Sequence, residues 1–462
     1  MAQILRNDLF NWDELQALGD LERLRLLLDY FPDEELIKDL ERARGRGRND
    51  YPIRPTWNLL LAGIVFGHPS IESLRREAQR NGQLRQLCGF DLGQGVQAVP
   101  TAAAYSHFLD LLIKRQDLVT KIFDRLVEDL RKVLPDFGKD LAGDGKALPS
   151  HAQPSKEKAK DRRGDPDANI GRKVYHGKRA DGSPYEIIKE WFGYKAHLIV
   201  DARYELPVAF QVTKASAGEL PVMEATFDRL KEKHPELVAN CENVMGDKGY
   251  DSQAWINKLH LENGINPIID IRNMWKDGEK TKAAPGSRNV VYNYKGDVFC
   301  VVPKYEGQTP DNIMRRMAFG GFEADRETLK YLCPALHYGC ECAGRESCPV
   351  KHSARIKLDT DRRIFTPVAR SSYKWARLYN KRTAVERVNS RLDVSFGFEE
   401  HFIRGLAKME LRCGLALAVM LGMALGRVKE QQISKIRSLV QAVAPDQEPT
   451  RRGKNRRLKA AG

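Results

Sequence analysis

The order of elements predicted between residues 138 and 252 constrains the fold of this 462-residue chain most strongly. An apolar stretch leads to Asp144, and two strand-like runs follow, WFGYKAHLIV and LPVAFQV, with the turn DARYE between them. A helical pattern near 221–233 comes next, and then a short apolar strand that ends beside Asp247. A hairpin followed by a helix and another strand predicts an α/β fold, in which helices flank a mixed sheet.

Two aspartates at the predicted strand ends are candidate functional residues. Asp247, in ENVMGDKGYDS, directly follows a buried-type strand, and ligands usually bind just past the carboxyl ends of strands in α/β sheets. Asp144 stands between Gly143 and Gly145, which allow an unusual backbone path and close approach by a large ligand. The alternative for Asp144 is an ordinary turn, because charged residues flanked by glycine are common in turns.

A third acid comes much later, in the stretch YNKRTAVERVNSRLD from Tyr379 to Asp393. The stretch contains neither Pro nor Gly, so we predict a continuous helix. At about 100° per residue, one narrow stripe of this helix carries Tyr379, Arg382, Glu386, Asn389 and Asp393. The alternative is a solvated face on which Arg382 and Glu386 form an exposed pair, worth only a few tenths of a kcal/mol.

Positive charge is concentrated in two short segments. The formal net charge of the chain is +14. The segment 151–180 contains nine Lys and Arg against four Asp and Glu, and the tail from Arg451 to Gly462 contains six and no acid. Such concentration suits a polyanionic partner, and nucleic acid is the first candidate. The alternative is a pair of flexible solubilising segments.

The first 137 residues are predicted to be helical throughout. Leucines recur at helical spacing from Trp12 to Tyr30, SIESLRREAQRN is amphipathic, and Thr101 is a suitable helix start. Two helices joined by a short connection with several Arg are typical of a helix-turn-helix DNA-binding arrangement. A plain helical bundle has the same features, so both interpretations stay open.

The chain shows no sign of export or of a membrane span. Its first twenty residues, MAQILRNDLFNWDELQALGD, lack a charged start followed by an apolar run. The longest apolar run, near 413–426, is too short to cross a membrane. Eight cysteines without an export signal argue against a disulfide framework. We therefore expect a protein of the reducing cytoplasm.

A long segment separates Asp247 from Glu386. Within it, VVYNYKGDVFCVVP over 290–303 predicts a hairpin with a Lys-Gly-Asp turn. Four thiolates close in sequence could hold a structural zinc ion, but they lack the usual Cys-x2-Cys pairs, and free cysteines in a small loop domain are the alternative. These cysteines are Cys333, Cys340, Cys342 and Cys348.

Taken together, these motifs resemble those of DDE transposases of bacterial insertion sequences, in the RNase H-like, retroviral-integrase superfamily. The resemblance runs from about Tyr51 to Val428. It is carried by AGDGKAL at Asp144, DPDA at 165–168, GYKAHLIVD at 193–201, MGDKGYDS at Asp247 and YNKRTAVERVNSRL at Glu386.

The resemblance implies an RNase H-like catalytic core with an inserted strand-rich subdomain and an all-α N-terminal domain. The expected parts are a helical DNA-binding domain (1–137), the first part of the core (138–252), an insertion subdomain with the cysteines (253–372), the C-terminal helices of the core (373–440) and a basic disordered tail (441–462).

The resemblance also implies that Asp144, Asp247 and Glu386 bind two Mg²⁺ (or Mn²⁺) ions. Two such ions about 4 Å apart suit phosphodiester cleavage, because they activate the attacking oxygen and relieve charge on the leaving oxygen. Carboxylate oxygens are the hard ligands that Mg²⁺ prefers. Without metal, two such charges about 4 Å apart repel by about 4 kcal/mol at an effective dielectric of 20.

One branch of this family carries the signature Tyr-x2-Arg-x3-Glu-x6-Lys. Tyr379, Arg382 and Glu386 match it, but Asp393 replaces the final Lys, which is thought to contact a terminal phosphate in the family. The expected partners are transposon-end DNA and target DNA, with a homodimer on paired ends and no membrane. The residues expected to contact DNA are Tyr379, Arg382, Lys248, Lys146, Arg387, Arg391 and Trp275.

Two of these DNA contacts have specific reasons and alternatives. Arg387 and Arg391 are considered because they could compensate for the lost Lys, although both lie off the stripe. Trp275 is considered because an insertion-domain aromatic could stack on a flipped base, and a partly buried structural role is its alternative. For the whole chain, the alternatives are an inactive transposase-derived DNA-binding protein and a nuclease of the same fold.

Overall fold

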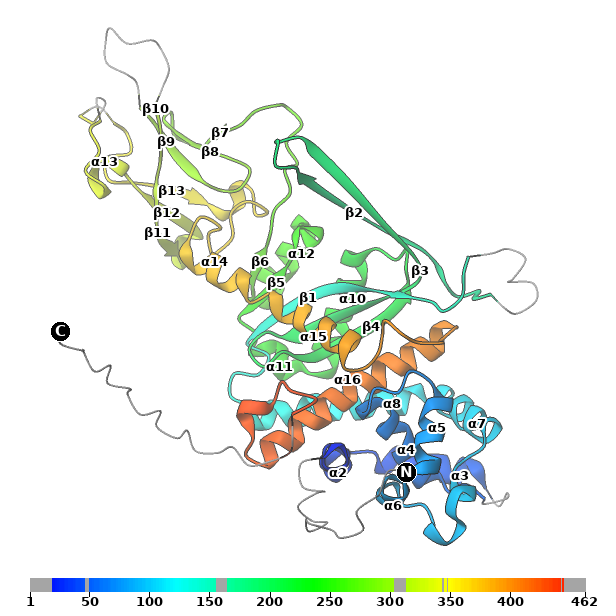
Figure 1. The fold of residues 1–462 in the computed structure, drawn as a ribbon. Helices are drawn as coiled ribbons and strands as arrows, with labels where there is room; N and C mark the ends of the chain where they lie inside the picture. The colour runs from blue at the N-terminus through cyan, green and yellow to red at the C-terminus, as the bar shows by residue number, and fades with distance from the viewer. Residues whose placement is uncertain are drawn as a thin grey trace, which may run out of the picture. The chain divides into compact units, whose positions relative to one another are not determined.

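The computed structural model of the chain describes residues 19–45, 50–154, 164–302, 313–342, 345–346, 348–441 and 443. It divides into two compact units (Figure 1). The helical unit comprises Met1–Val133, Val394–Glu400 and Gly414–Gly462, and the sheet unit comprises Leu134–Asp393 and His401–Cys413. Residues 155–163 of the basic segment, and the predicted tail apart from residues 441 and 443, lie outside the described residues.

The N-terminal part of the helical unit is helical, as predicted. Ser70 and Thr101 cap two of the helices, because each side chain accepts a hydrogen bond from the backbone N–H three residues later. Gly63 permits close packing of two others, since a Cβ there would lie 2.7 Å from a methyl group of Leu74. The helices are α2 (Asp20–Tyr30), α3 (Glu34–Arg44), α4 (Ile53–Val65), α5 (Ile71–Arg80), α6 (Gly82–Cys88), η1 (Leu92–Ala98), α7 (Ala102–Ile113) and α8 (Gln116–Val133).

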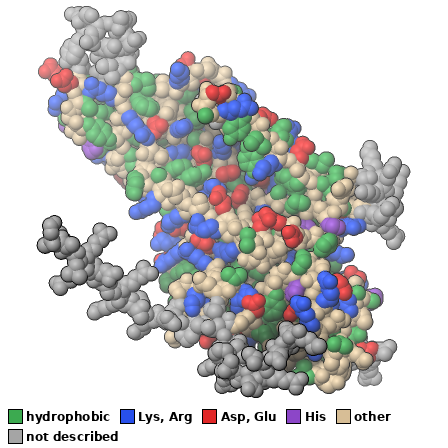
Figure 2. Space-filling view, viewed as in Figure 1, with side chains coloured by type: hydrophobic (Ala, Val, Ile, Leu, Met, Phe, Trp, Pro, Cys, Tyr) green, Lys and Arg blue, Asp and Glu red, His purple; other side chains and the backbone are tan. Residues whose placement is uncertain are grey.

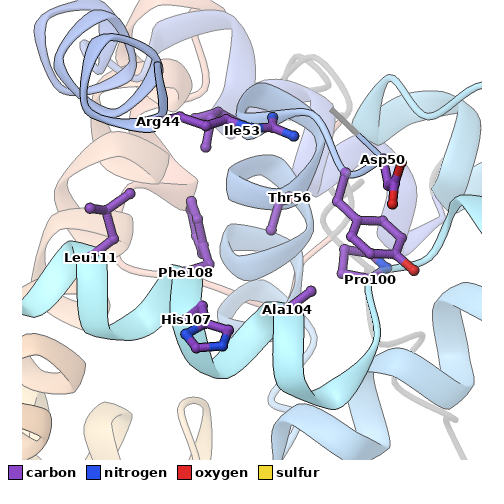
Figure 3. Close-up of a pocket in the computed structure, with 10 residues that line it drawn as sticks. Arg44, Asp50, Ile53, Thr56, Pro100, Ala104, His107, Phe108 and Leu111 are labelled. Carbon is purple, nitrogen blue, oxygen red and sulfur yellow. The ribbon is translucent and has the colours of Figure 1, made fainter. Parts of the chain in front are cut away.

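A pocket of about 280 Å³ lies between α4 and α7 of the helical unit (Figure 3). Ile53 and Thr56 line it from one helix, and Ala104, His107 and Phe108 line it from the other. None of the three predicted catalytic carboxylates lines this pocket.

Helix α16 (Leu406–Lys429) is the most apolar long helix among the described residues. It is long and apolar enough to cross a membrane, yet 89% of its most apolar window is buried inside the protein. The prediction that the apolar run near 413–426 is too short to cross a membrane is therefore wrong as to length, and the burial of this helix is typical of a core helix. A short 3-10 turn, η6 (Ile433–Lys435), follows it.

The sheet unit is built on a mixed sheet whose strand pairing agrees with the predicted α/β fold. In the described part of the chain this sheet has six strands, in the order β2-β3-β1-β5-β6, with β4 also paired to β3. The pairs β1/β3, β2/β3 and β3/β4 are antiparallel, whereas β1/β5 and β5/β6 are parallel. The strands are β1 (Asp140–Pro149), β2 (Asn169–Lys178), β3 (Pro184–Asp201), β4 (Leu206–Lys214), β5 (Asn243–Gly246) and β6 (Asn266–Ile269).

Helices pack on this sheet at different strands. Helix α10 packs on β3 and β4, and helix α14 packs on β5 and β6. The predicted hairpin is confirmed, because β3 and β4 pair around the DARYE turn. The helices are α10 (Glu219–Lys233), α11 (Pro235–Ala239), η2 (Lys248–Tyr250), α12 (Gln253–Asn257), η3 (Lys258–Glu262), α14 (Tyr373–Asn380) and α15 (Thr383–Val394).

The predicted continuous helix from Tyr379 to Asp393 is wrong, since α14 ends at Asn380 and α15 begins at Thr383. Around the joint, backbone N–H groups bond to carbonyls three residues earlier, as in Arg382 N to Tyr379 O at 2.9 Å. At the joint, Lys381 forms a 2.5 Å ion pair with Asp140 of β1.

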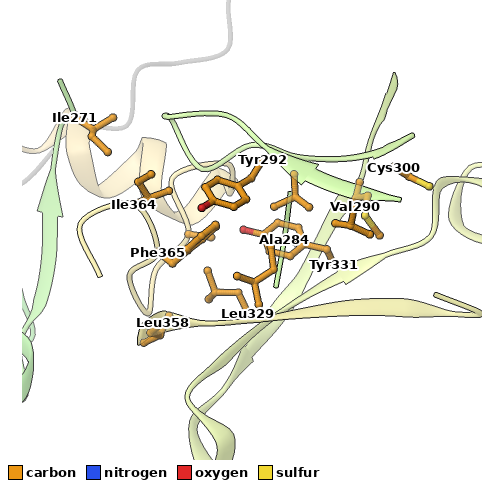
Figure 4. Packing of buried hydrophobic residues seen from close by; sticks show 14 residues of the cluster. Ile271, Ala284, Val290, Tyr292, Cys300, Leu329, Tyr331, Leu358, Ile364 and Phe365 are labelled. Atoms are coloured by element: carbon orange, nitrogen blue, oxygen red, sulfur yellow. The ribbon is translucent and has the colours of Figure 1, made fainter. Parts of the chain in front are cut away.

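The segment between Asp247 and Glu386 contains the predicted strand-rich insertion, including the β8–β9 hairpin. Its own hydrophobic core includes Val290, Leu329, Tyr331 and Phe365 (Figure 4). The elements are β7 (Lys282–Ala283), β8 (Val290–Tyr292), β9 (Val298–Val302), β10 (Ile313–Arg316), β11 (Ala318–Glu323), η4 (Ala324–Arg326), β12 (Thr328–Leu332), α13 (Pro334–His337), β13 (Ser353–Lys357) and η5 (Leu358–Thr360).

Candidate active site

Asp144 lies within β1, and Asp247 directly follows the neighbouring parallel strand β5. Ala142 of β1 pairs with Met245 of β5, and the same register continued by two residues sets Asp144 beside Asp247. Side chains at matching positions of parallel strands point to the same face of a sheet. The turn alternative for Asp144 is therefore wrong, because Asp144 lies within β1 and pairs with Leu198 of β3.

The glycines around Asp144 show which face of the sheet it occupies. A Cβ on Gly143 would lie 2.6 Å from Met223 Cε, and one on Gly145 would lie 3.2 Å from Glu219 Oε1, both in α10. The absence of a side chain at these glycines therefore lets α10 pack closely on β1. The predicted unusual backbone path is not found, because neither glycine has a positive φ. Because side chains alternate along a strand, Asp144 points to the opposite face.

Helix α15 lies on this opposite face. Lys146, two residues after Asp144 on β1, forms a 2.5 Å ion pair with Asp393 of α15, and the two side chains are 12% and 22% exposed. Asp393 belongs to the predicted stripe with Glu386, so that stripe faces the strand that carries Asp144. The acid that replaces the family's Lys is thus paired with a lysine from β1.

Glu386 itself is half exposed and bonded to a neighbouring guanidinium. Arg382 Nη2 donates to Glu386 Oε1 at 2.6 Å. The same guanidinium lies 5.7 Å from the centre of the Tyr379 ring, and Tyr379 stacks on Trp375 with ring centres 4.7 Å apart. The aromatic pair therefore supports the guanidinium that binds Glu386. The sequence interpretation missed Trp375, although it stands four residues before Tyr379, on the same helical face.

The electrostatics of the region centre on Asp144. Burial raises the pKa of Asp144 to about 6, and the negative charges of Asp247 and Glu219 raise it further. The positive charge of Lys173 and the hydrogen bond from the Gly145 N–H act in the opposite direction and lower it. Burial lowers the pKa of Lys173 on β2, but Asp144 and Glu219 outweigh it, so the pKa of Lys173 is raised. Lys173 and Glu219 are members of the site that the sequence interpretation missed.

A buried hydroxyl lies in the same neighbourhood. The side chain of Tyr250 is 1% exposed, and its hydroxyl has no hydrogen-bond partner among the described residues. Burial raises the pKa of Tyr250 well above its usual value, and the charges of Asp144, Glu219 and Asp247 raise it further. Burial and these negative charges therefore keep the Tyr250 hydroxyl protonated.

The carboxylates fit a divalent cation by donor chemistry and charge. Asp144 is buried beside a second carboxylate and carries a raised pKa, which is the imbalance that a bound cation removes. In the part of the chain that the structure describes, no three His, Cys, Asp or Glu side chains are already grouped as metal ligands.

The other predicted DNA contacts lie in varied surroundings. Lys248 is exposed directly after Asp247. Arg387 Nε donates to Glu205 Oε1 at 2.7 Å, and Arg391 Nη2 donates to the Glu205 carbonyl oxygen at 2.5 Å. Both arginines therefore anchor α15 to the turn between β3 and β4.

Trp275 is half-buried against the hydrophobic core of the insertion. It meets Tyr292 edge to face at a ring distance of 6.0 Å, and Lys282 Nζ lies 4.7 Å from its ring centre. These contacts are those of the structural alternative, in which the indole supports the insertion.

All eight cysteines are free thiols. Burial raises the pKa of the Cys300 thiol to about 11, and nearby Cys348, Cys333 and Cys342 add to the shift. Asn289 Nδ2 lies 3.2 Å from Cys348 Sγ and 4.0 Å from Cys300 Sγ. Cys300 and Cys348 are therefore neighbours, but among the described residues no three possible ligands are grouped closely enough to hold a metal ion as they stand.

Comparison with known proteins identifies the family. A family model described as "Transposase DDE domain" matches residues 172–421, more than half of the chain and a range that includes Asp247 and Glu386. No curated protein matches the chain. A piggyBac transposase, solved as a synaptic complex with hairpin DNA, is 12% identical with a TM-score of 0.38 over 92% of this chain and 80% of that one, a likeness too low to carry any argument. The chain therefore belongs to the DDE transposase family and has the RNase H-like core that the sequence predicts.

Proposed function

We propose that this transposase binds the terminal inverted repeats of an insertion sequence, hydrolyses the phosphodiester at each end and joins the 3′-hydroxyl to target DNA. Asp144, Asp247 and Glu386 would hold two Mg²⁺ (or Mn²⁺) ions. The observation that carries this proposal is the ion pair of Lys146 with Asp393, because it brings the stripe of Glu386 to the face of Asp144. The parallel register of β1 and β5 supports the place of Asp247.

The metal pair, when bound, would supply an activated nucleophile and charge relief for the leaving oxygen. The protein's own side chains would bind and orient the scissile strand. Arg382, stacked over Tyr379, presents a planar fork of donors that suits a phosphate. Its release from Glu386 would free the carboxylate and the guanidinium together. Tyr250 would offer its buried hydroxyl to a group bound between the aspartates.

We propose further DNA contacts outside the carboxylates. Lys248 would meet a phosphate next to the cleaved bond. Lys146 would do so only with donors that are not used by Asp393, and Arg387 and Arg391 only with donors that are not used by Glu205. Trp275 would meet an unpaired base only by leaving its contacts with Tyr292 and Lys282. Figure 2 shows Lys and Arg side chains in several groups on the visible face, with acids between them.

The assignment of parts is also a proposal. Residues 1–137 would recognise the inverted repeats, 138–252 and 373–440 would form the catalytic core, and 253–372 would form the insertion. The enzyme would act in the cytoplasm at the nucleoid, as a homodimer on paired ends. Zinc at Cys333, Cys340, Cys342 and Cys348 stays a prediction, to be tested by measuring the zinc content of the purified protein.

Cleavage of end-containing DNA tests the proposal. Wild-type protein should nick such DNA only when Mg²⁺ or Mn²⁺ is added, and Glu386→Gln should abolish nicking while end binding persists. Glu232→Gln, at an exposed position of α10, is the matched control and should nick normally. Nicking by Glu386→Gln at the wild-type rate would exclude the proposed site. Salt-sensitive binding without cleavage would favour an inactive DNA-binding protein, and nicking without strand joining would favour a nuclease.

A further inference from the structure

Helix α15 is attached to strand β1 near both of its ends. Lys381, just before α15, pairs with Asp140 at the start of β1, and Asp393, near the end of α15, pairs with Lys146 further along the strand. The strand and the helix therefore run in the same direction.

The spacings of the two ion pairs match. The six residue steps from Asp140 to Lys146 span about 20 Å at about 3.3 Å per step. The twelve residue steps from Lys381 to Asp393, ten of them within α15, span about 18 Å at about 1.5 Å per step. Because the two lengths agree, both pairs can form without distorting either element, and together they fix how far α15 can slide along β1.

The ion pair of Lys146 with Asp393 joins the strand that carries Asp144 to the helix that carries Glu386. Glu386 precedes Asp393 by about 10.5 Å along the helix, and Asp144 precedes Lys146 by about 7 Å along the strand. With Lys146 and Asp393 taken as level, Glu386 and Asp144 are offset by about 4 Å along the shared direction. A shift of one helical turn, about 5.4 Å, would change this offset completely.

The other contacts of α15 do not set this position alone. Val385, Val388 and Leu392 are buried beside the stripe, and apolar packing is non-directional. Arg387 and Arg391 bind Glu205 from the flank of the helix. Only Lys381 and Asp393, of these residues, attach the helix to the strand that carries Asp144.

We infer that Asp393 is a positioning residue, which through its ion pair with Lys146 sets the distance between Glu386 and Asp144. Its acidic side chain, unexpected at this position of the signature, is complementary to a lysine on β1. The inference deepens the proposed function and rests on Glu386 and Asp144 acting together in it.

A cross-linking experiment tests the inference without requiring activity. In the full chain, Asp144→Cys and Glu386→Cys are introduced together, and a short bifunctional maleimide is added, with the joined peptides identified by mass spectrometry. Asp393→Asn should slow this cross-link at least fivefold. Asp228→Asn is the matched control, because it removes a comparable 2.6 Å pair with Lys258 elsewhere in the sheet unit, and it should have no effect.

The charge-reversed pair separates positioning from general damage to the fold. Lys146→Asp combined with Asp393→Lys should restore the cross-linking rate to within about twofold of the parent. An unchanged rate in Asp393→Asn, or a reversed pair that is slower than Asp393→Asn, would overturn the inference.

Activity gives a second readout once the wild type has been shown to cleave end DNA. There Asp393→Asn should lower kcat by about ten- to a hundredfold, because small misplacement of a catalytic group costs rate, while KM for DNA stays constant. Absence of wild-type cleavage would count against the proposed function and leave the cross-linking result standing.

Discussion

Arg382 donates a 2.6 Å hydrogen bond to Glu386, one helical turn further along the chain. The third proposed metal ligand is thus occupied by a guanidinium, while Asp144 and Asp247 lie side by side without it. Burial lowers the pKa of Arg382, but the hydrogen bond and charge of Glu386 raise it, and the charge of Asp144 on β1 raises it further.

Arg382→Gln should therefore separate metal binding from DNA binding. An ion pair with an exposed partner is worth about 0.2–1 kcal/mol, so its loss should strengthen Mn²⁺ binding to the free protein by roughly two- to fivefold. The same variant should bind end DNA more weakly, because a phosphate contact is lost. Calorimetry with Mn²⁺ and a salt-controlled DNA titration measure the two effects. Weaker Mn²⁺ binding in the variant would contradict the idea that Arg382 and the metal ion compete for Glu386.

Asp144→Asn should stabilise the metal-free protein in a pH-dependent way. The folded pKa of about 6 lies above the ordinary value of 3.8, so ionising Asp144 costs free energy in the folded state. That cost is absent below pH about 4, grows as the pH rises towards 6, and is complete above it. Urea unfolding should show a gain of about 1–3 kcal/mol at pH 8 and almost none at pH 4. Equal gains at both pH values would contradict the assigned pKa.

Trp375→Ala should disturb catalysis through Tyr379 and Arg382. An aromatic pair contributes about 0.5–1.5 kcal/mol beyond its buried area, and its loss removes the support behind Arg382. We expect cleavage to fall about tenfold with only a small decrease in thermal stability, whereas Trp375→Phe should keep most of the rate. Single-turnover cleavage by the two variants measures this. Equal rates for Ala and Phe would exclude a role for the stack.

Arg391→Ala should act mainly on stability. Its partner Glu205 is 5% exposed, has a φ of +58° and also binds Arg387. Removing one partner of a buried carboxylate leaves its charge poorly compensated, so the free energy of unfolding should fall by about 2–3 kcal/mol. Denaturant titration measures this loss. A stable variant with weaker DNA binding would show instead that Arg391 contacts phosphate.

Much of the fold follows from local patterns. The strand-like runs of β3 and β4, the apolar strand before Asp247 and the helix start at Thr101 are short-range signals, and the structure contains each of these elements. The break at Lys381 is not marked by any Pro or Gly in the sequence, and the ion pair at the joint joins Lys381 to Asp140, 241 residues away.

The site was predictable only in part, for the same reason. Asp144, Asp247 and Glu386 stand in recognisable motifs. Lys173 on β2 and Glu219 at the start of α10 come near Asp144 only in the folded chain, and no local sequence pattern marks them. Gly143 and Gly145 are predicted to allow close approach of a ligand. In the structure they instead allow close approach of α10. Arg387 and Arg391 have an unforeseen partner in Glu205, whose position depends on the β3–β4 turn.

The most direct measurement is an experimental structure with Mn²⁺, using the anomalous signal of manganese to locate the metal. The account predicts density between Asp144 and Asp247, with a Glu386 oxygen also coordinating and with Arg382 turned away from that carboxylate. Metal bound elsewhere, or Glu386 still bonded to Arg382 with manganese held by the aspartates alone, would contradict it.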